Sequence, residues 1–402
     1  MCVPWRKRRF MPDPGDRRVM NRILIISGHD FRSPRKANIH FIAQELARNS
    51  AVRFLSVGFS CLSLFKGDPR AELAAKANVA EYENGIECFL WKTLIHPFNM
   101  KILPLRWLEH AFFRYYRSHL HKIVIKWIEE AGIVIVESGL GVALIEPIRR
   151  ANPETRIIYN VSDDLATIEC STFLQAELGR VAGCLDWVRL PSAVLARGFS
   201  PELPLYLIPH GVDLSLRDQA EPSPYGAGIH AVSVGSMLFD EIFFILAADQ
   251  MPDVQFHIIG SGRTSDALRR PNIHLYGEMK FAETVKYIKH ATFCIAPYRH
   301  REHAGYLADT SMKLLQYDFF GLPAVCPVFV AGERPHRFAY APGDAASIKQ
   351  AIEEAIRQGR HKPGHYLSWA DVANRLVEPH AYPNTPLLSA GEYPHSPSRA
   401  VA

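Results

Sequence analysis

The chain has 402 residues, of which 48 % are hydrophobic, and a formal net charge of +5 at pH 7. This length and composition exclude a disordered or fibrous protein and favour a globular protein of two domains. The seven cysteines are scattered and include no C-x-x-C pair, so we expect reduced thiols in the cytoplasm rather than a disulfide framework or a zinc site.

The positive charge lies in the first half of the chain. Residues 1–210 hold 28 Lys and Arg against 21 Asp and Glu, a net charge of +7, whereas the remainder has a net charge of −2. Such an asymmetry indicates that the first half meets an anionic partner, which could be nucleic acid, acidic lipid or a phosphorylated substrate.

The first 20 residues are predicted to be a flexible tail. Four basic residues at positions 6–9 imitate the start of a signal peptide, but no apolar segment follows them. No run of about 18 apolar residues occurs, so no transmembrane helix is expected.

Residues 21–210 read as a first α/β domain. A continuous apolar run at 22–27 leads through a polar loop into a segment with helical spacing at 39–47, which predicts a strand buried on both faces and then a helix. Further strands are predicted at 51–57, 85–91, 132–136, 156–161, 187–190 and 205–208.

A stretch rich in Pro, Ser, Asp and Gly at 211–228 is predicted to be an interdomain linker, followed by a second α/β domain at 229–365. Its strands are predicted near 230–234, 254–259, 273–276, 293–296 and 324–326. We expect a C-terminal helix at 366–383 that packs back on the first domain, and a disordered tail at 384–402. The alternation predicts two doubly wound, Rossmann-like domains facing a central cleft at the carboxyl ends of their strands.

The strand ends of the second domain carry chemistry that suits a nucleotide. Glycines follow two strands at 235 and 260, Glu278 can accept hydrogen bonds from ribose hydroxyls, and Tyr298 can flank a base. Each feature alone is more often an ordinary turn or loop residue. The G-x-G-x-x-G fingerprint and the Walker A loop are absent, which favours a nucleotide sugar over a dinucleotide or ATP.

The segment ADTSMKLLQYDFFGLPAVCP at 308–327 is the most informative of the chain. Polar residues Asp309, Thr310 and Ser311 run into a helix predicted to open with Lys313. Hydroxyls and a lysine at a helix N-terminus suit a diphosphate, although an ordinary capped helix before a buried strand has the same pattern.

Two adjacent acids, Asp163 and Asp164, follow the predicted strand at 156–161. A carboxylate at this edge can act as a general base on a hydroxyl nucleophile. Either acid can instead cap the helix predicted to begin near Leu165, so one acid could cap while the other faces the cleft.

Aromatic and basic residues alternate between Phe89 and Trp127. They suit a membrane interface, where rings lie at headgroup level beside anionic lipid, and the candidate contacts are Arg106, Trp107, Arg114 and Arg117. The same composition also suits stacking on nucleic acid or an amphipathic helix whose aromatics fill the domain core.

Read together, ordered strings along the chain resemble the glucuronosyltransferases of xanthan- and acetan-type exopolysaccharide assembly in bacteria. They include HDFR at 29–32, ANIHFI at 37–42, ESG at 137–139, GSMLFD at 235–240, YGEMK at 276–280 and SMKLLQYDFFGLPAVCP at 311–327. These strings run in the same order over roughly residues 23–382.

The resemblance implies an inverting, metal-independent GT-B glycosyltransferase that needs no cofactor and is peripheral on the cytoplasmic face of the inner membrane. It would move glucuronate from UDP-glucuronate to the mannose of a polyprenyl-diphosphate-linked oligosaccharide through a β-1,2 bond, with no nucleic-acid partner. The family's base matches Asp163. Its donor contacts match Met237, Glu278, Met279, Tyr298, Lys313 and Gln316, and position adds Ser236.

The family strings in the first domain supply four acceptor-side candidates, His29, Arg32, Asn38 and Glu137. Two other functions remain alternatives. A UDP-sugar epimerase has the same architecture but no use for the aromatic-basic segment, and a non-catalytic lipid- or nucleic-acid-binding protein leaves the strand ends of the second domain without a role.

Overall fold

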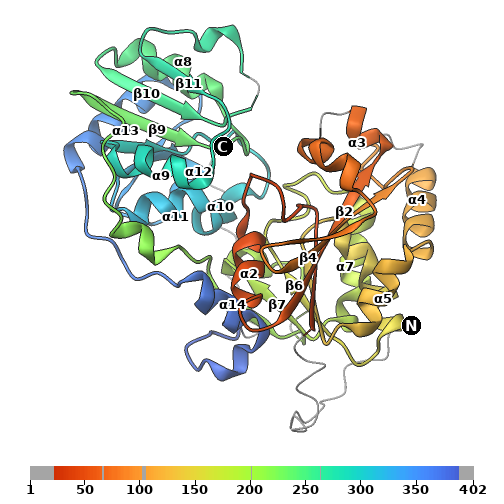
Figure 1. Ribbon diagram of the computed structural model, residues 1–402. Helices are drawn as coiled ribbons and strands as arrows, with labels where there is room; N and C mark the ends of the chain where they lie inside the picture. Colours follow the sequence, from red (N-terminus) through yellow and green to blue (C-terminus); the bar gives the residue numbers. More distant parts are fainter. Residues whose placement is uncertain (1–21, 66–67, 102–105, 201, 263, 389–402) are drawn as a thin grey trace. The chain divides into compact units, whose positions relative to one another are not determined.

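The computed structural model describes residues 22–65, 68–101, 106–200, 202–262 and 264–388. The chain forms two compact units, one built from Met1–Pro209 with Trp369–Ala402 and the other from His210–Ser368. Each unit contains one predominantly parallel sheet flanked by helices, which confirms the prediction of two doubly wound α/β domains (Figure 1).

The first unit contains an eight-stranded sheet in the order β3-β4-β2-β1-β5-β6-β7-β8, parallel except for β3, which pairs antiparallel with β4. The order reverses direction between β1 and β5, so their carboxyl ends border the switch point where open α/β sheets bind ligands. The strands are β1 Arg22–Ser27, β2 Ala51–Ser60, β3 Ala80–Glu83, β4 Ile86–Thr93, β5 Ile133–Glu137, β6 Arg156–Asn160, β7 Trp187–Leu190 and β8 Leu205–Leu207.

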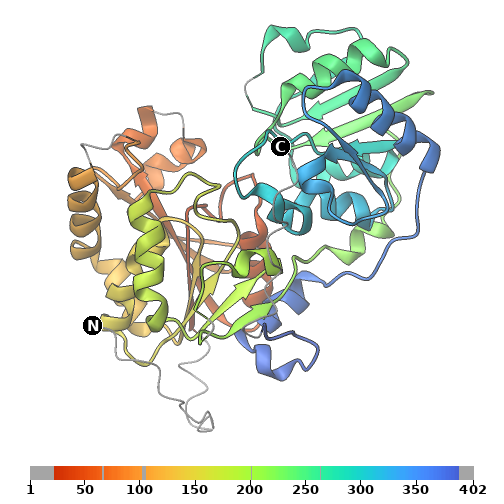
Figure 2. The same ribbon diagram turned by 180° about the vertical axis from the view of Figure 1, so that it is seen from behind.

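Helices cover both faces of this sheet. α2 and α14 contact each other on one face, and α5 and α7 lie on the other (Figure 1 and Figure 2). Right-handed crossovers that run in opposite directions from the switch point put helices on opposite faces. The helices and 3₁₀ turns are α2 Asn38–Leu46, α3 Cys61–Phe65, η2 Pro69–Lys76, α4 Arg106–Ser118, α5 Lys122–Glu130, η4 Leu140–Leu144, α6 Ile145–Ala151, α7 Thr172–Val181, η5 Ala182–Cys184, η6 Ala193–Ala196, α14 Trp369–Val377 and η10 Pro379–Ala381.

The second unit contains a six-stranded parallel sheet in the order β11-β10-β9-β12-β13-β14, with its switch point between β9 and β12. Apolar residues of α8 and α13, among them Phe244 and Ile352, form the core on one face of this sheet. The elements are η7 Leu214–Arg217, β9 Ile229–Val234, α8 Glu241–Gln250, β10 Val254–Ile259, η8 Asp266–Leu268, β11 Ile273–Tyr276, α9 Phe281–His290, β12 Phe293–Ile295, η9 Ala304–Tyr306, α10 Leu307–Thr310, α11 Met312–Phe319, β13 Ala324–Pro327, α12 Val328–Ala331, β14 Arg337–Tyr340 and α13 Ala345–Gln358.

The segment after η10 pairs with the outer edge of β8. Leu207 donates its N–H to the carbonyl of Pro386, and Leu388 donates to the carbonyl of Leu205, both at 2.9 Å. The prediction of a disordered tail from residue 384 is therefore wrong for residues 384–388, because backbone hydrogen bonds hold them. The remainder of that tail, like the predicted tail at 1–20, lies outside the described residues.

The described helices are short. The longest of them, α13, has 14 residues. Within the described part of the chain, no helix has the length and apolar character needed to cross a bilayer.

Two buried histidines make the stability of the fold sensitive to acid. Burial lowers the pKa of His40 to about 4, and its Nε2 lies 2.9 Å from the carbonyl of Asp30. Burial also lowers the pKa of His257 to about 4, aided by the neighbouring His274 and His230. Both rings are therefore neutral in the folded protein at pH 7.

We expect the free energy of unfolding to fall as the pH falls from about 6.5 towards 4. In the unfolded chain each histidine takes up a proton near pH 6.5, whereas in the folded chain it does so only near pH 4. The contribution of the two histidines to the free energy of unfolding is therefore fully present above pH 6.5 and is lost as the pH falls to 4. At about 1.4 kcal/mol per pKa unit, His40 contributes roughly 3 kcal/mol, and solvent screening makes the contribution of His257 smaller.

Urea unfolding between pH 7.5 and 4.5 measures this loss. His257→Gln should reduce the slope of the free energy of unfolding against pH by the equivalent of up to one proton taken up on unfolding. His119→Gln, which changes an exposed histidine, should leave that slope unchanged. Equal slopes in the two variants would contradict the assignment.

Candidate functional site

In the second unit, main-chain hydrogen bonds join the two loops that flank the switch point. The N–H of Asp240, after β9, donates to the carbonyl of Pro297, after β12, at 2.9 Å, and Arg299 donates to Leu238 at 2.7 Å. Gly235 has a φ of +91° at the point where the chain turns out of β9, a conformation that favours glycine. The predicted donor residues Ser236 and Met237 follow it and are exposed.

Glu278 lies against the glycine loop that follows β10. A Cβ atom added to Gly260 would lie 3.5 Å from one carboxylate oxygen of Glu278, and one added to Gly262 would lie 3.7 Å from the Cβ of Ser236. The structure therefore brings together the predicted residues Ser236 and Glu278 from two loops, around two glycines with positive φ. An exposed carboxylate beside open backbone suits a ribose.

The start of α11 is organised by Ser311. Its hydroxyl accepts the N–H of Leu314 at 3.2 Å, so it is the N-cap, and it lies 2.5 Å from the hydroxyl of Tyr298. The helix begins at Met312 rather than Lys313, because the preceding residues form the separate turn of α10.

Lys313 has an unusual environment for a lysine side chain. Its Nζ is fully buried, has no hydrogen-bond partner among the described residues, and lies 4.9 Å from the centre of the Tyr298 ring. Burial lowers the pKa of this ammonium to about 8. An ammonium without a partner inside a protein is costly, which is typical of a group that is completed by a ligand.

Tyr298 does not have the environment predicted for it. The side chain is 2 % exposed and its hydroxyl is engaged with Ser311, so its ring is not presented to flank a base. Its ring instead packs beside the ammonium of Lys313, and its hydroxyl bonds Ser311, the N-cap of α11. Met279, after β11, and Gln316, one turn beyond Lys313, are both half-buried.

In the first unit, one of the two adjacent acids caps a turn. Asp164 Oδ1 accepts the N–H of Thr167 at 2.8 Å and its hydroxyl at 3.1 Å, so Asp164 caps a turn. Asp163 is half-buried in the loop that follows β6. The helix predicted near Leu165 is wrong: only a turn occupies 165–169, and α7 begins at Thr172 with Ser171 as its N-cap.

The acceptor-side candidates differ in accessibility. His29 is exposed after β1, and its N–H donates to Ser27 Oγ at 2.9 Å. Asn38, at the start of α2, is 6 % exposed, and its Oδ1 has no partner among the described residues. Glu137, at the end of β5, is 3 % exposed, with hydrogen bonds to both carboxylate oxygens from Ser27 and Ser162. Glu137 is therefore buried rather than presented to an acceptor.

Arg32 is an internal ion-pair residue, which corrects its prediction as an acceptor contact. Its side chain is 5 % exposed and donates to both oxygens of Asp30 at 2.9 Å and to Glu81 at 3.1 Å. Burial alone raises the pKa of Asp30, but the hydrogen bonds and charge of Arg32 outweigh it and hold that pKa below its usual value. The pair fixes the loop between β1 and α2.

The aromatic-basic segment divides into a core side and a surface side. Trp91 stacks on Tyr116 and Phe113 stacks on the half-buried Phe173, each pair with ring centres 4.4 Å apart. Trp91, Phe113 and Tyr116 are part of the core. Arg117, predicted to contact the membrane, instead pairs with Glu177 at 3.1 Å and Glu146 at 3.5 Å. The partners lie in distant segments, so the spacing within α4 could not reveal this inward orientation.

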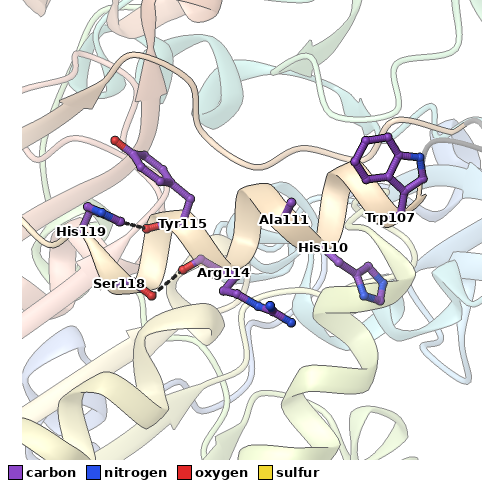
Figure 3. Close-up of a pocket in the computed structure, with 7 residues that line it drawn as sticks. All are labelled: Trp107, His110, Ala111, Arg114, Tyr115, Ser118 and His119. Carbon is purple, nitrogen blue, oxygen red and sulfur yellow. Dashed lines mark hydrogen bonds between the residues drawn. The ribbon is translucent and has the colours of Figure 1, made fainter.

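The outer side of α4 is exposed. Trp107 is 69 % exposed, and Arg106 and Arg114 are also exposed. A pocket of about 430 Å³ lies along this side. In Figure 3, Trp107 and His110 lie at one end of the row of lining residues and Tyr115 lies towards the other. Three of the four predicted membrane contacts thus lie on the surface.

Within the described residues, no group of three His, Cys, Asp or Glu side chains is placed to hold a metal ion. Ser138 was not among the predicted site residues, although it lies in the ESG string at 137–139. Its hydroxyl lies within hydrogen-bond distance of the backbone of Asp163. Only the meeting of β5 and β6 in the sheet reveals this contact.

Comparison with known proteins gives a consistent result. Residues 25–191 match the family model of the glucuronosyltransferase GumK, N-terminal domain. The chain is 46 % identical over 377 residues to the UDP-glucuronate:glycolipid 2-beta-glucuronosyltransferase of Xanthomonas campestris pv. campestris, covering 94 % of this chain and 93 % of that protein.

Solved structures with low sequence identity have the same fold. Trehalose-6-phosphate synthase OtsA superposes with a TM-score of 0.56 at 10 % identity, over 89 % of this chain and 94 % of that one. A UDP-forming trehalose-phosphate synthase from Burkholderia xenovorans gives a TM-score of 0.55 at 10 % identity, over 90 % of this chain and 94 % of that one. These likenesses confirm the GT-B fold.

Proposed function

Because the chain belongs to the family of UDP-glucuronate:glycolipid 2-beta-glucuronosyltransferases, we propose that it moves glucuronate from UDP-glucuronate to a polyprenyl-diphosphate-linked oligosaccharide. The acceptor is a mannose, the bond formed is β-1,2, and the product serves exopolysaccharide biosynthesis. The observation that carries this proposal is the 46 % identity, which extends over 94 % of the chain. Family membership also argues against the epimerase and non-catalytic alternatives.

On the donor side, Lys313 and the N-terminus of α11 hold the diphosphate of UDP. The buried Nζ without an internal partner supports this role, since a diphosphate oxygen would complete it. As UDP leaves, its negative charge grows, and a preorganised cation stabilises that charge. The reaction proposed here needs no metal ion for this step.

Glu278 suits the ribose, and Ser236, Met237, Met279 and Gln316 complete the donor contacts that the family resemblance suggests. Support comes from the loop geometry, in which the carboxylate of Glu278 lies beside Gly260 with the loop of Ser236 next to it.

Asp163 is the proposed base. It takes the proton of the attacking mannose hydroxyl while that oxygen bonds to C1 of the glucuronate and the C1–O bond to UDP breaks, with the electron pair leaving on UDP. Attack from the face opposite the leaving group inverts the configuration at C1. The capping role of Asp164 supports this assignment, because it gives that acid a structural function in the turn at Thr167.

Incubation of the protein with UDP-glucuronate and lipid-linked mannosyl-cellobiose tests the transfer. We expect release of UDP and a product heavier by one glucuronate residue, measured by mass spectrometry. UDP release without this product, or a product from UDP-glucose at equal rate, would contradict the proposed donor and acceptor.

The outer side of α4 is proposed to bind the cytoplasmic face of the inner membrane as a peripheral contact. Exposed Trp107, Arg106 and Arg114 support this, because aromatic rings and cations suit headgroups and anionic lipid. The glycolipid acceptor of the family would lie in such a membrane.

Arg106→Ser combined with Arg114→Ser should weaken binding to vesicles with acidic lipid by roughly 30-fold. Each arginine near an anionic surface contributes about 1 kcal/mol, and salt screens that attraction. Flotation with liposomes at low and high salt measures the loss. Arg117→Ser is the matched control on the same helix, since Arg117 is already paired with Glu146 and Glu177. Equal loss in the control would contradict the surface assignment.

A further inference from the structure

The hydroxyl of Ser138, directly after β5, binds the backbone of Asp163 on the neighbouring β6 loop. It donates to the carbonyl of Asp163 at 2.9 Å. It also accepts the N–H of Ser162 at 3.1 Å and that of Asp163 at 3.4 Å. The hydroxyl of Tyr159 also donates to Ser138 Oγ, at 3.4 Å. Since Ser138 Oγ has two lone pairs, Tyr159 and the N–H of Asp163 share one of them. One side chain thus binds both main-chain groups of Asp163.

Glu137, the residue before Ser138, also binds the loop after β6. One carboxylate oxygen of Glu137 accepts the hydroxyl of Ser162 at 2.6 Å, and the other accepts the hydroxyl of Ser27, at the end of β1. Glu137 is 3 % exposed. Hydrogen bonds to a buried carboxylate are stronger than those between neutral groups, so Ser162 is firmly placed next to Asp163.

We propose that Glu137 and Ser138 form a clamp that positions Asp163 to remove the proton of the acceptor hydroxyl. Both are positioning residues, because they touch Asp163 and its neighbour rather than the substrate. The proposal rests on the proposed function, in which Asp163 is the base. It gives the buried Glu137 a role other than acceptor contact.

The loop after β6 has no helix of its own to position Asp163. No helix begins at Asp163, since a turn at 165–169 and irregular backbone on either side of it precede the start of α7 at Thr172. A general base must lie within hydrogen-bond distance of the proton that it removes, and a misplacement of about 1 Å can cost roughly 100-fold in rate. The end of a rigid, fully buried strand, β5, supplies the fixed point.

A double-mutant cycle tests the proposal in the full chain. We expect Ser138→Ala to lower kcat by roughly 10-fold or more, with UDP affinity and the KM for UDP-glucuronate within about 2-fold of the parent. In the Asp163→Asn background the same change should lower the residual rate by less than about 3-fold, because no base remains to be positioned. Glu137→Gln, which keeps the shape of the side chain, should behave in the same way.

Ser63→Ala is the control. Ser63, in α3 of the first unit, is 3 % exposed and its hydroxyl accepts the backbone N–H of Ser60 at 3.1 Å, so its replacement matches the loss of a buried serine hydroxyl. It should leave kcat within about 2-fold. Equal losses from Ser138→Ala with and without the Asp163 carboxylate would overturn the clamp and leave the base assignment intact. Parental turnover in Asp163→Asn alone would overturn the base assignment and the clamp together, while product formation by the parent would still report the transfer itself.

Discussion

Replacing Asp163 by asparagine is expected to lower turnover by roughly 10²- to 10⁴-fold, the range for loss of a general base. The amide cannot take up the proton of the attacking hydroxyl, but it can keep the volume of the side chain. Folding and UDP affinity should stay near those of the parent. Initial rates with saturating UDP-glucuronate, together with calorimetric titration of UDP, measure both quantities.

Asp164→Ala is the matched comparison, because it changes the adjacent acid. It removes the cap on the turn at Thr167, so it should cost about 1 kcal/mol of stability and little turnover. A greater loss of turnover in Asp164→Ala than in Asp163→Asn would reverse the assignment of the base.

Replacing Lys313 by methionine is expected to weaken UDP binding by roughly 10- to 100-fold and to slow transfer as well. A hydrogen bond to a charged group contributes about 1.5–3 kcal/mol, and the departing UDP gains charge beside this site. The same change removes a buried ammonium that has no internal partner, so the stability of the free protein should stay equal or rise.

Calorimetry with UDP and thermal unfolding of the free protein test both expectations for Lys313→Met. Lys349→Met, which changes a half-exposed lysine of α13, is the control and should alter neither property. Because burial lowers the pKa of Lys313 to about 8, UDP affinity in the parent should also decline as the pH rises above 8. Unchanged UDP affinity in Lys313→Met would exclude the diphosphate role.

Local sequence patterns predicted most of the fold. The strands at 187–190, 254–259 and 273–276 have the predicted bounds, since apolar runs between turn residues determine buried parallel strands. β3 and β14 were not predicted. Both are edge strands with several polar or exposed residues, so they lack the continuous apolar run of the inner strands.

The positions of candidate residues were predictable where they follow a strand or begin a helix, as for Glu278 after β11 and Lys313 near the start of α11. Their contacts were not predictable where a partner lies far away in the chain. Arg32 and Arg117 look like exposed cations in sequence, yet Glu81, Glu146 and Glu177 pair with them. Tyr298 likewise reads as an accessible aromatic in the sequence, but its side chain is buried and its hydroxyl is bonded to Ser311.

The pairing of residues 386–388 with β8 has a consequence for shortened forms of the chain. Composition suggests that the sequence can be cut before residue 384 without harm. Such a cut would remove the backbone partners of Leu205 and Leu207 and would leave the outer edge of β8 open. Unpaired strand edges recruit other chains, so the shortened protein would be prone to self-association and aggregation even if the loop that carries Asp163 stayed intact.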